Sequence, residues 1–188
     1  MSLNSRVSDV SSEDGEVRGG LHGIFHAGLP VQSFETALAG LAATYPKLGR
    51  KGVLFKRAQR KARQIEDDFP DMSIDQISAI VLYTMEDDPK QNSPYFMMNK
   101  ALRDKDRKAA LPWRDYIWLL LHALKLLPPS PARNVFRGCK KPMSEFGLQV
   151  EPNKEVVWSG FSSTATTVDV MNTFPWLQIR GLKFRSSN

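Results

Sequence analysis

The sequence has few of the residues that build covalent or metal-held frameworks. Its 188 residues include one cysteine, Cys139, and three histidines. A single cysteine excludes a disulfide within the chain and fits a reducing compartment. The histidines, His22, His26 and His122, do not show the spacing of metal ligands. The sequence therefore predicts no metal site.

Long apolar runs are also missing. The most apolar segment, IWLLLHALKLL, is interrupted by His122 and Lys125, and it is shorter than the roughly 20 residues that a membrane span requires. Residues 1–20 are polar, rich in Ser and Gly, and without the apolar centre of a signal peptide. We expect no membrane span and a disordered tail over residues 1–20. A cytoplasmic location and secretion without a recognisable signal both stay open.

Positive charge is what the chain has in excess. The formal net charge is +6 at pH 7, and much of it lies in GRKGVLFKRAQRKARQ, residues 49–64. Such a run suits nucleic acid, an acidic membrane surface or an acidic partner, and it is also typical of a solvated helix face. Because aromatic residues are not interleaved with these cations, base stacking is not expected. We expect no nucleic-acid partner, although a basic helical nucleic-acid-binding module stays open as an alternative.

Helical periodicity dominates the first 130 residues. Ser33 is a candidate N-cap for a helix over SFETALAGLAATY, and the basic segment is predicted to be helical from Val53 to about Asp67. Ser73 and Gln76 form a capping box at the start of SIDQISAIVLYTME. The residues expected on one stripe of that helix are Ile74, Ile77, Val81 and Thr84.

Two further helices carry proline near their start. Ser93 and Pro94 begin a helix over YFMMNKALRDKDR, in which Tyr95, Met98 (or Asn99) and Leu102 share a face. Pro112 is expected to open the last helix, PWRDYIWLLLHALKLL, which Pro128 and Pro129 end. That helix is apolar almost all round, so we expect it to be buried.

The pattern changes after Pro131. RNVFRG and EVVWSGF are short segments typical of strands, each with a glycine at or near its end. Helices first and strands afterwards predict an α+β fold in a single domain over residues 21–188. Its helical lobe would cover about residues 33–130 and its β region about residues 131–188.

The order of these elements resembles a known enzyme class. A helix ending in Tyr83-Thr84 is followed by YFMMNKALR, a long apolar helix, a strand with Arg-Gly and a strand with Gly-Phe-Ser-Ser-Thr. Over roughly residues 73–174 this resembles the arginine-serine-glutamate class of mono-ADP-ribosyltransferases. The resemblance implies an N-terminal helical lobe, an antiparallel β core of two sheets that is incomplete at its C-terminus, and NAD bound as a substrate in the cleft.

The resemblance also implies which residues bind NAD. Arg137 matches the NAD-binding arginine of the class, and its guanidinium fork suits a pyrophosphate. Gly138 follows it, two hydroxyl residues match the serine-threonine-serine motif, and a tyrosine and an asparagine lie four residues apart on one helix face. Taken singly, each is also typical of ordinary packing or of a surface position. The predicted NAD-binding residues are Arg137, Gly138, Ser163, Thr164, Tyr95 and Asn99.

A catalytic residue is not identified in this chain. The class uses a Glu-x-Glu pair, whose last carboxylate stabilises the cation that forms when the nicotinamide bond breaks. No acidic residue follows Asp169, and Glu145, Glu151 and Glu155 do not have the required placement. The resemblance implies transfer of ADP-ribose from NAD to a protein arginine, with release of nicotinamide. An inactive relative that binds NAD or a partner protein is the alternative.

Overall fold

A computed structural model of the chain describes residues 28–49, 53–104, 106–128 and 160–161. Of these residues, 73% are helical and 0% are in strands. All the described helices belong to one compact unit, residues 20–128. The predicted tail, residues 1–20, lies outside the described residues.

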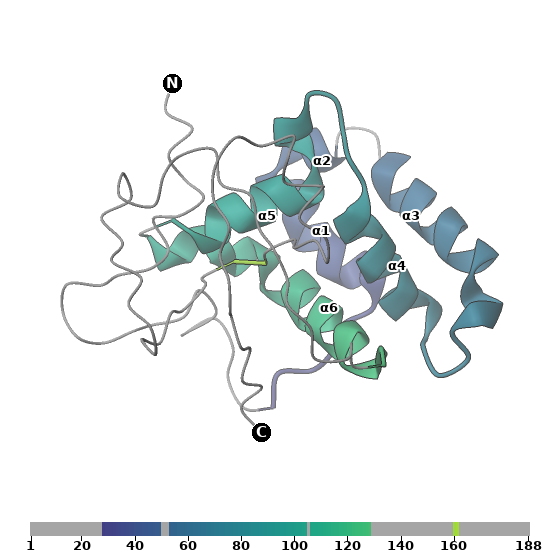
Figure 1. The fold of residues 1–188 in the computed structure, drawn as a ribbon. Helices are drawn as coiled ribbons and strands as arrows, with labels where there is room; N and C mark the ends of the chain where they lie inside the picture. The colour runs from purple at the N-terminus through teal and green to yellow at the C-terminus, as the bar shows by residue number, and fades with distance from the viewer. Residues whose placement is uncertain (1–27, 50–52, 105, 129–159, 162–188) are drawn as a thin grey trace, which may run out of the picture. The chain divides into compact units, whose positions relative to one another are not determined.

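Six α-helices follow one another along this unit (Figure 1). They are α1 (Phe34–Thr44), α2 (Pro46–Gly49), α3 (Val53–Gln64), α4 (Ile74–Thr84), α5 (Pro94–Leu102) and α6 (Arg114–Leu126). Three 3₁₀ helices lie between them: η1 (Glu66–Asp68), η2 (Lys90–Asn92) and η3 (Arg107–Trp113).

The predicted α+β fold with an antiparallel β core is wrong for the part of the chain that the structure describes. That part is helical and contains no strand and no sheet. Most of the predicted β region, residues 131–188, lies outside the described residues. Gly160 and Phe161, the described end of EVVWSGF, form a bend and an irregular residue rather than a strand. The physical reason at this point is Gly160, because a residue without a side chain weakens a strand and favours a bend.

Two helix starts are confirmed. At α1 the Ser33 hydroxyl accepts a hydrogen bond from the Thr36 amide at 3.2 Å. At α4 the Ser73 amide donates to Gln76 Oε1 at 2.8 Å, and the Gln76 amide donates to the Ser73 hydroxyl at 3.3 Å. Both contacts span three residues, so the sequence alone contains everything they require.

Other helix boundaries differ from the prediction. Helix α3 ends at Gln64 rather than near Asp67, and the acidic turn η1 follows it. Carboxylates are unfavourable near the negative end of a helix dipole, which explains the early end. Pro112 lies inside η3, and α6 begins only at Arg114.

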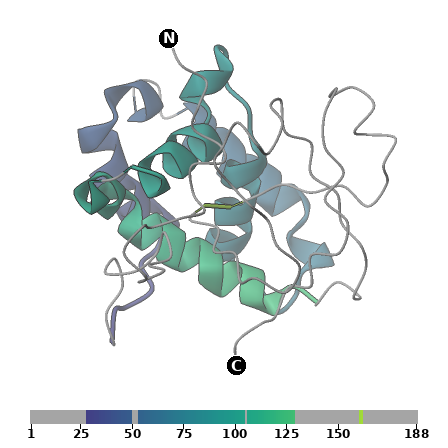
Figure 2. The ribbon, with the colours of Figure 1, turned by 60° about the vertical axis from the view of Figure 1, so that its left-hand side comes forward.

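Helices α1, α4 and α6 contact one another, and η3 contacts α1 and α6. Both views show α6 along one side of the bundle (Figure 1 and Figure 2). Trp113 stacks at an angle on Tyr45 and edge-on to Tyr116, with ring centroids 5.4 and 6.1 Å apart. The largest fully buried side chains include Trp113, Tyr116, Phe34, Leu41 and Leu82.

The buried faces of two helices differ from the predicted ones. On α4 the buried residues are Ile77, Ser78, Ala79 and Leu82. Ile74 and Val81 of the predicted stripe are half-buried and pack against the core cluster that contains Ile77, whereas Thr84 is exposed, so the stripe is confirmed in part. The buried face is wider than the stripe, because α4 contacts α1, α3, α5 and α6. On α6 the buried residues are Tyr116, Ile117, Leu119, Leu120 and Ala123, whereas the last turn is open, since Leu124 and Leu126 are 37% and 46% exposed.

Candidate functional site

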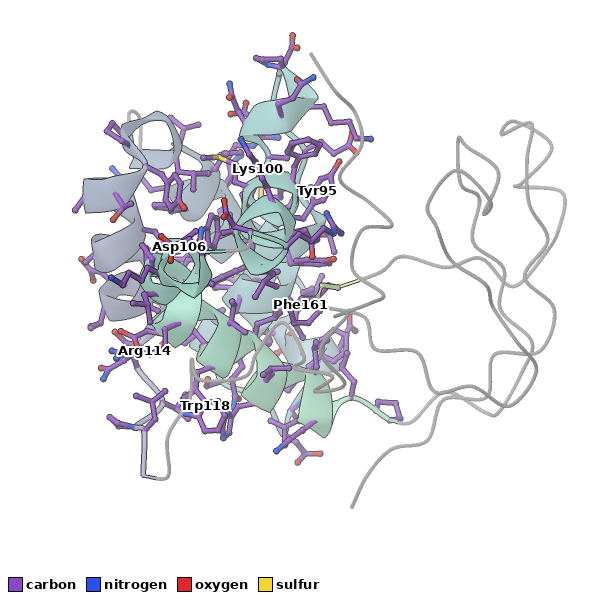
Figure 3. The ribbon with its side chains drawn as sticks, turned by 90° about the vertical axis from the view of Figure 1, so that its left-hand side faces the viewer. Tyr95, Lys100, Asp106, Arg114, Trp118 and Phe161 are labelled. Atoms are coloured by element: carbon purple, nitrogen blue, oxygen red, sulfur yellow. The ribbon has the colours of Figure 1, made fainter. Side chains whose placement is uncertain are left out.

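The structure describes two of the six residues predicted to bind NAD. Tyr95 and Asn99 both lie on α5. Arg137, Gly138, Ser163 and Thr164 lie outside the described residues. The expected convergence of Arg137 with the two hydroxyls therefore stays a prediction, and the described part of the candidate site is the surface around Tyr95 (Figure 3).

Helix α5 begins where the sequence predicts, but for a different reason. Ser93 is the N-cap residue, yet its side chain makes no capping hydrogen bond. Instead the buried Ser93 hydroxyl accepts from the Asp87 amide at 2.9 Å. This bond closes the loop between α4 and α5, so Ser93 positions α5 against the segment that carries Glu86 and Lys90.

Asn99 is held inside its own helix. Only 5% of it is exposed, and its Nδ2 donates to the Tyr95 carbonyl oxygen at 2.9 Å. Arg103, which continues the same face one turn later, is the C-cap of α5, and its amide donates to the Asn99 carbonyl at 3.2 Å. The two predicted residues are thus coupled by a local bond, which fixes the Asn99 side chain relative to the turn that carries Tyr95.

The Tyr95 side chain is held from three sides. Its hydroxyl donates to Glu86 Oε1 at 3.1 Å. Its ring meets the Tyr83 ring edge-on, with centroids 6.3 Å apart. Lys90 Nζ lies 5.9 Å from the centre of the Tyr95 ring and 2.9 Å from Glu86 Oε1. We name Tyr83, Glu86, Lys90 and Tyr95 the Tyr95 cluster.

The charges of the Tyr95 cluster stabilise each other at an exposed position. The pKa of Glu86 is lowered from its ordinary value, first by the hydrogen bond from Lys90 and then by that from Tyr95. The pKa of Lys90 is raised, chiefly by the hydrogen bond to Glu86. Because both side chains are largely exposed, solvent screens the pair and its contribution to stability is small. The cluster therefore orients Tyr95, and the two pKa shifts keep Glu86 and Lys90 in their charged forms.

Glu86 and Lys90 were not predicted to belong to the site. Their spacing of four residues is the usual sign of an ion pair along one helix face. Here α4 ends at Thr84, and the pair bridges a loop and the first residue of η2. No sequence signal shows that this loop folds back onto α5, so the pair with Tyr95 depends on the tertiary structure.

The other described residues do not contain a metal-binding cluster. His122 lies on α6, where its Nδ1 is 2.9 Å from the Trp118 carbonyl oxygen. Within the described ranges, no group of three or more His, Cys, Asp or Glu residues is arranged to hold a metal ion. In the same part of the chain, each helix is too short or too polar to cross a membrane.

The chain was compared with protein-family models, curated proteins and solved structures. The chain matches no protein-family model, and neither a curated protein nor a solved structure matches it.

Proposed function

We propose that the protein is an NAD-dependent mono-ADP-ribosyltransferase that modifies arginine side chains of proteins. The observation that carries the proposal is the co-occurrence, in one order, of Tyr95 and Asn99, the pair Arg137-Gly138, and the hydroxyls Ser163 and Thr164. Each element alone is common in proteins. Their occurrence together, in the order found in the arginine-serine-glutamate class, is much less common.

The geometry of α5 supports a binding role for Tyr95. An aromatic ring that is fixed before the ligand arrives loses little conformational entropy when it binds. The Glu86 carboxylate, the Tyr83 ring and the Lys90 ammonium restrict the Tyr95 ring, and Asn99 bonds to the backbone of the same turn. This part of α5 is therefore a rigid support for one side of a ligand.

The other residues have complementary roles in this proposal. The Arg137 guanidinium donates paired, charge-assisted hydrogen bonds to the NAD pyrophosphate. Gly138 lets the dinucleotide approach the backbone, because no Cβ stands in the way. The hydroxyls of Ser163 and Thr164 bind the nicotinamide ribose and limit its rotation.

The reaction is a substitution at the anomeric carbon of that ribose. The bond to nicotinamide breaks and its electron pair leaves with the nicotinamide nitrogen. An arginine nitrogen of the target forms the new bond and loses a proton to solvent. A carboxylate is needed beside the developing cation, and no residue of this chain is assigned to that role.

Binding and transfer can be tested separately. NAD binding to the full chain is measured by isothermal titration calorimetry, for the wild type and for Arg137→Ala and Arg137→Lys. We expect Arg137→Ala to weaken binding by about 10- to 100-fold, since hydrogen bonds to charged groups contribute about 1.5–3 kcal/mol. Arg137→Lys should bind NAD little better than Arg137→Ala, because an ammonium lacks the planar fork of a guanidinium. Arg63→Ala, at an exposed position of α3, is the matched control and should bind NAD normally.

Transfer is followed with agmatine, a small arginine mimic, and NAD labelled in its adenylate half. Labelled ADP-ribosyl-agmatine together with released nicotinamide supports the proposal. NAD binding without either product supports the alternative of an inactive NAD-binding relative and contradicts transferase activity. If NAD does not bind at all, both are wrong.

A further inference from the structure

Helix α3 carries the strongest charged surface of the described residues. Its 12 residues contain five cations and no carboxylate. All five are exposed: Lys56, Arg57, Arg60, Lys61 and Arg63. Within the part of the chain that the structure describes, none of them pairs with an acidic side chain. We name these five residues the α3 basic face.

Packing on α4 determines the direction of this face. The buried residues of α3 are Leu54, Ala58 and Ala62, spaced four apart, and the helix packs on α4. At about 100° per residue, Lys56, Arg60 and Arg63 lie on the side opposite Ala58. Figure 1 shows α3 at the edge of the bundle, beyond α4. Lys56, Arg60 and Arg63 therefore point away from the bundle, Arg57 and Lys61 lie on one flank, and the small alanines hold the helix close to α4.

The charge pattern is unfavourable for the helix itself. Lys56 and Arg60, and likewise Arg57 and Lys61, are like charges four residues apart, and Arg60 and Arg63 are three apart. Such pairs repel each other on a helix surface. Packing on α4 needs only the buried residues and does not explain this arrangement. A bound polyanion does, because it relieves the repulsion of all five cations at once.

The composition of the face selects the polyanion. Binding of a helix to a membrane uses its apolar face, but the apolar face of α3 already packs on α4. The one exposed large apolar residue on α3 is Val53. The one aromatic residue, Phe55, is half-buried, so bases have no ring to stack on. Three arginine forks, by contrast, suit phosphate oxygens.

We propose that the α3 basic face binds the sugar-phosphate backbone of a nucleic-acid duplex without reading its bases. From Lys56 to Arg63 the helix advances about 10 Å, and a duplex carries one negative charge about every 1.7 Å of its axis. Lys56, Arg60 and Arg63 therefore face phosphates directly, and the long side chains of Arg57 and Lys61 can add contacts from one flank, to five at most. The sequence led us to expect no nucleic-acid partner because aromatic residues are missing, but contacts with the backbone need none.

The neighbouring acidic turn limits the contact. Glu66, Asp67 and Asp68 of η1 are exposed and follow α3 directly. These carboxylates repel phosphates, so the duplex meets the helix and not the turn beyond it. The contact involves about five phosphates at most, which makes binding weak and strongly dependent on salt.

Salt-dependent fluorescence anisotropy tests the proposal. A fluorescein-labelled duplex of about 20 base pairs is titrated with the full chain between 50 and 200 mM NaCl. We expect a slope of log K against log salt of about −4.5 for five contacts, at about −0.9 per phosphate. Two duplexes of unrelated sequence should bind equally well. Unequal binding contradicts recognition of the backbone alone.

Two triple variants locate the contact. Lys56→Gln, Arg60→Gln and Arg63→Gln together should make the slope less steep by about 2.7 and weaken binding at 50 mM NaCl at least tenfold. The control, Lys100→Gln, Lys108→Gln and Lys125→Gln, removes the same charge from exposed positions outside α3 and should keep the wild-type slope. Circular dichroism checks that both variants are folded. If the α3 triple variant unfolds, it is replaced by the double variant Arg57→Gln and Lys61→Gln, for which the slope should become less steep by about 1.8.

Three further results would overturn the proposal. The first is equal weakening by both triple variants, which indicates an effect of net charge. The second is no binding at 50 mM NaCl. The third is binding to phosphatidylserine vesicles with no binding to the duplex, which identifies a membrane surface instead. NAD binding by the α3 variants should equal that of the wild type, so failure here is distinguishable from failure of the proposed function.

Discussion

The side chains around Tyr95 show how much a single residue depends on its neighbours in space. The spacing of Tyr95 and Asn99 predicts a shared helix face, and both lie on α5. The partners of Tyr95 come from another segment, since its hydroxyl bonds to Glu86, nine residues earlier. A residue type and a spacing can therefore nominate a ligand-binding tyrosine, but the contacts that orient its ring are tertiary.

Ser78 is a residue whose environment suggests a stabilising substitution. It is buried in α4, and its hydroxyl has no hydrogen-bond partner among the described residues. Leaving a buried hydroxyl unsatisfied costs about 1–3 kcal/mol. We predict that Ser78→Ala leaves the free energy of unfolding unchanged or raises it by about 1 kcal/mol, measured by urea denaturation. Ala79→Ser, which adds a hydroxyl at the neighbouring buried position, should lower it, and a large loss in Ser78→Ala would contradict the expectation.

Two of the helices begin at a serine that caps them, and one helix ends just before a run of carboxylates. Ser33 and Ser73 bond to amides three residues ahead, and α3 stops before the acidic turn η1. Ser93 is the exception, because its hydroxyl serves the preceding loop and not its own helix. The same residue type at the same position thus has a local role in α4 and a tertiary role in α5.

The capping box of α4 is testable by substitution. Ser73→Ala removes the acceptor for the Gln76 amide and also the reciprocal geometry of the box. We expect a loss of about 0.5–2 kcal/mol in the free energy of unfolding, measured by urea denaturation. Thr84→Ala, at the other end of the same helix and exposed, is the control and should change stability by less than about 0.5 kcal/mol. If Ser73→Ala and Thr84→Ala lose the same free energy of unfolding, the capping box does not stabilise α4 beyond an ordinary surface residue.

At the scale of the whole molecule, long-range contacts join the helices of the described unit. The buried Tyr116 hydroxyl of α6 donates to the Ala79 carbonyl oxygen of α4 at 3.0 Å. The Trp118 indole donates to the Leu29 carbonyl oxygen at 2.9 Å, which attaches the segment before α1 to α6. Each bond joins segments far apart in sequence, so neither follows from periodicity.

The bond of Tyr116 leads to a prediction about stability and pH. Tyr116→Phe leaves the Ala79 carbonyl without this donor and should cost about 1–3 kcal/mol at pH 7. Burial raises the pKa of the Tyr116 hydroxyl in the folded protein. The unfolded chain therefore loses this proton first, and the wild type loses stability as the pH rises above about 10, the ordinary tyrosine value. Urea denaturation from pH 7 to 11 should show a smaller alkaline loss in Tyr116→Phe.

Tyr45→Phe is the control for that measurement. The Tyr45 hydroxyl makes a longer bond of 3.4 Å to the Ala109 carbonyl oxygen, and Tyr45 is only half-buried. Tyr45→Phe should therefore lower the free energy of unfolding at pH 7 by less than Tyr116→Phe does. If the stability advantage of the wild type over Tyr116→Phe does not diminish above pH 10, burial of the neutral phenol is not the cause.

The local features of this protein follow from residues that are neighbours in the chain. The caps at Ser33 and Ser73 and the helical character of the basic segment are properties of neighbouring residues, so periodicity and residue type predict them. The sequence also nominated six residues for NAD, of which Tyr95 and Asn99 lie on one helix and Arg137, Gly138, Ser163 and Thr164 stay predictions.

The tertiary structure decided which faces are buried and which residues meet. It widened the buried face of α4, because four helices contact it, and it gave the described residues helices and no strand in place of the predicted α+β fold. It also turned Ser93 toward Asp87 and Glu86 toward Tyr95. These contacts join separate segments of the chain, six residues apart for Asp87 and Ser93 and nine for Glu86 and Tyr95, and helical periodicity does not contain such a return of the chain.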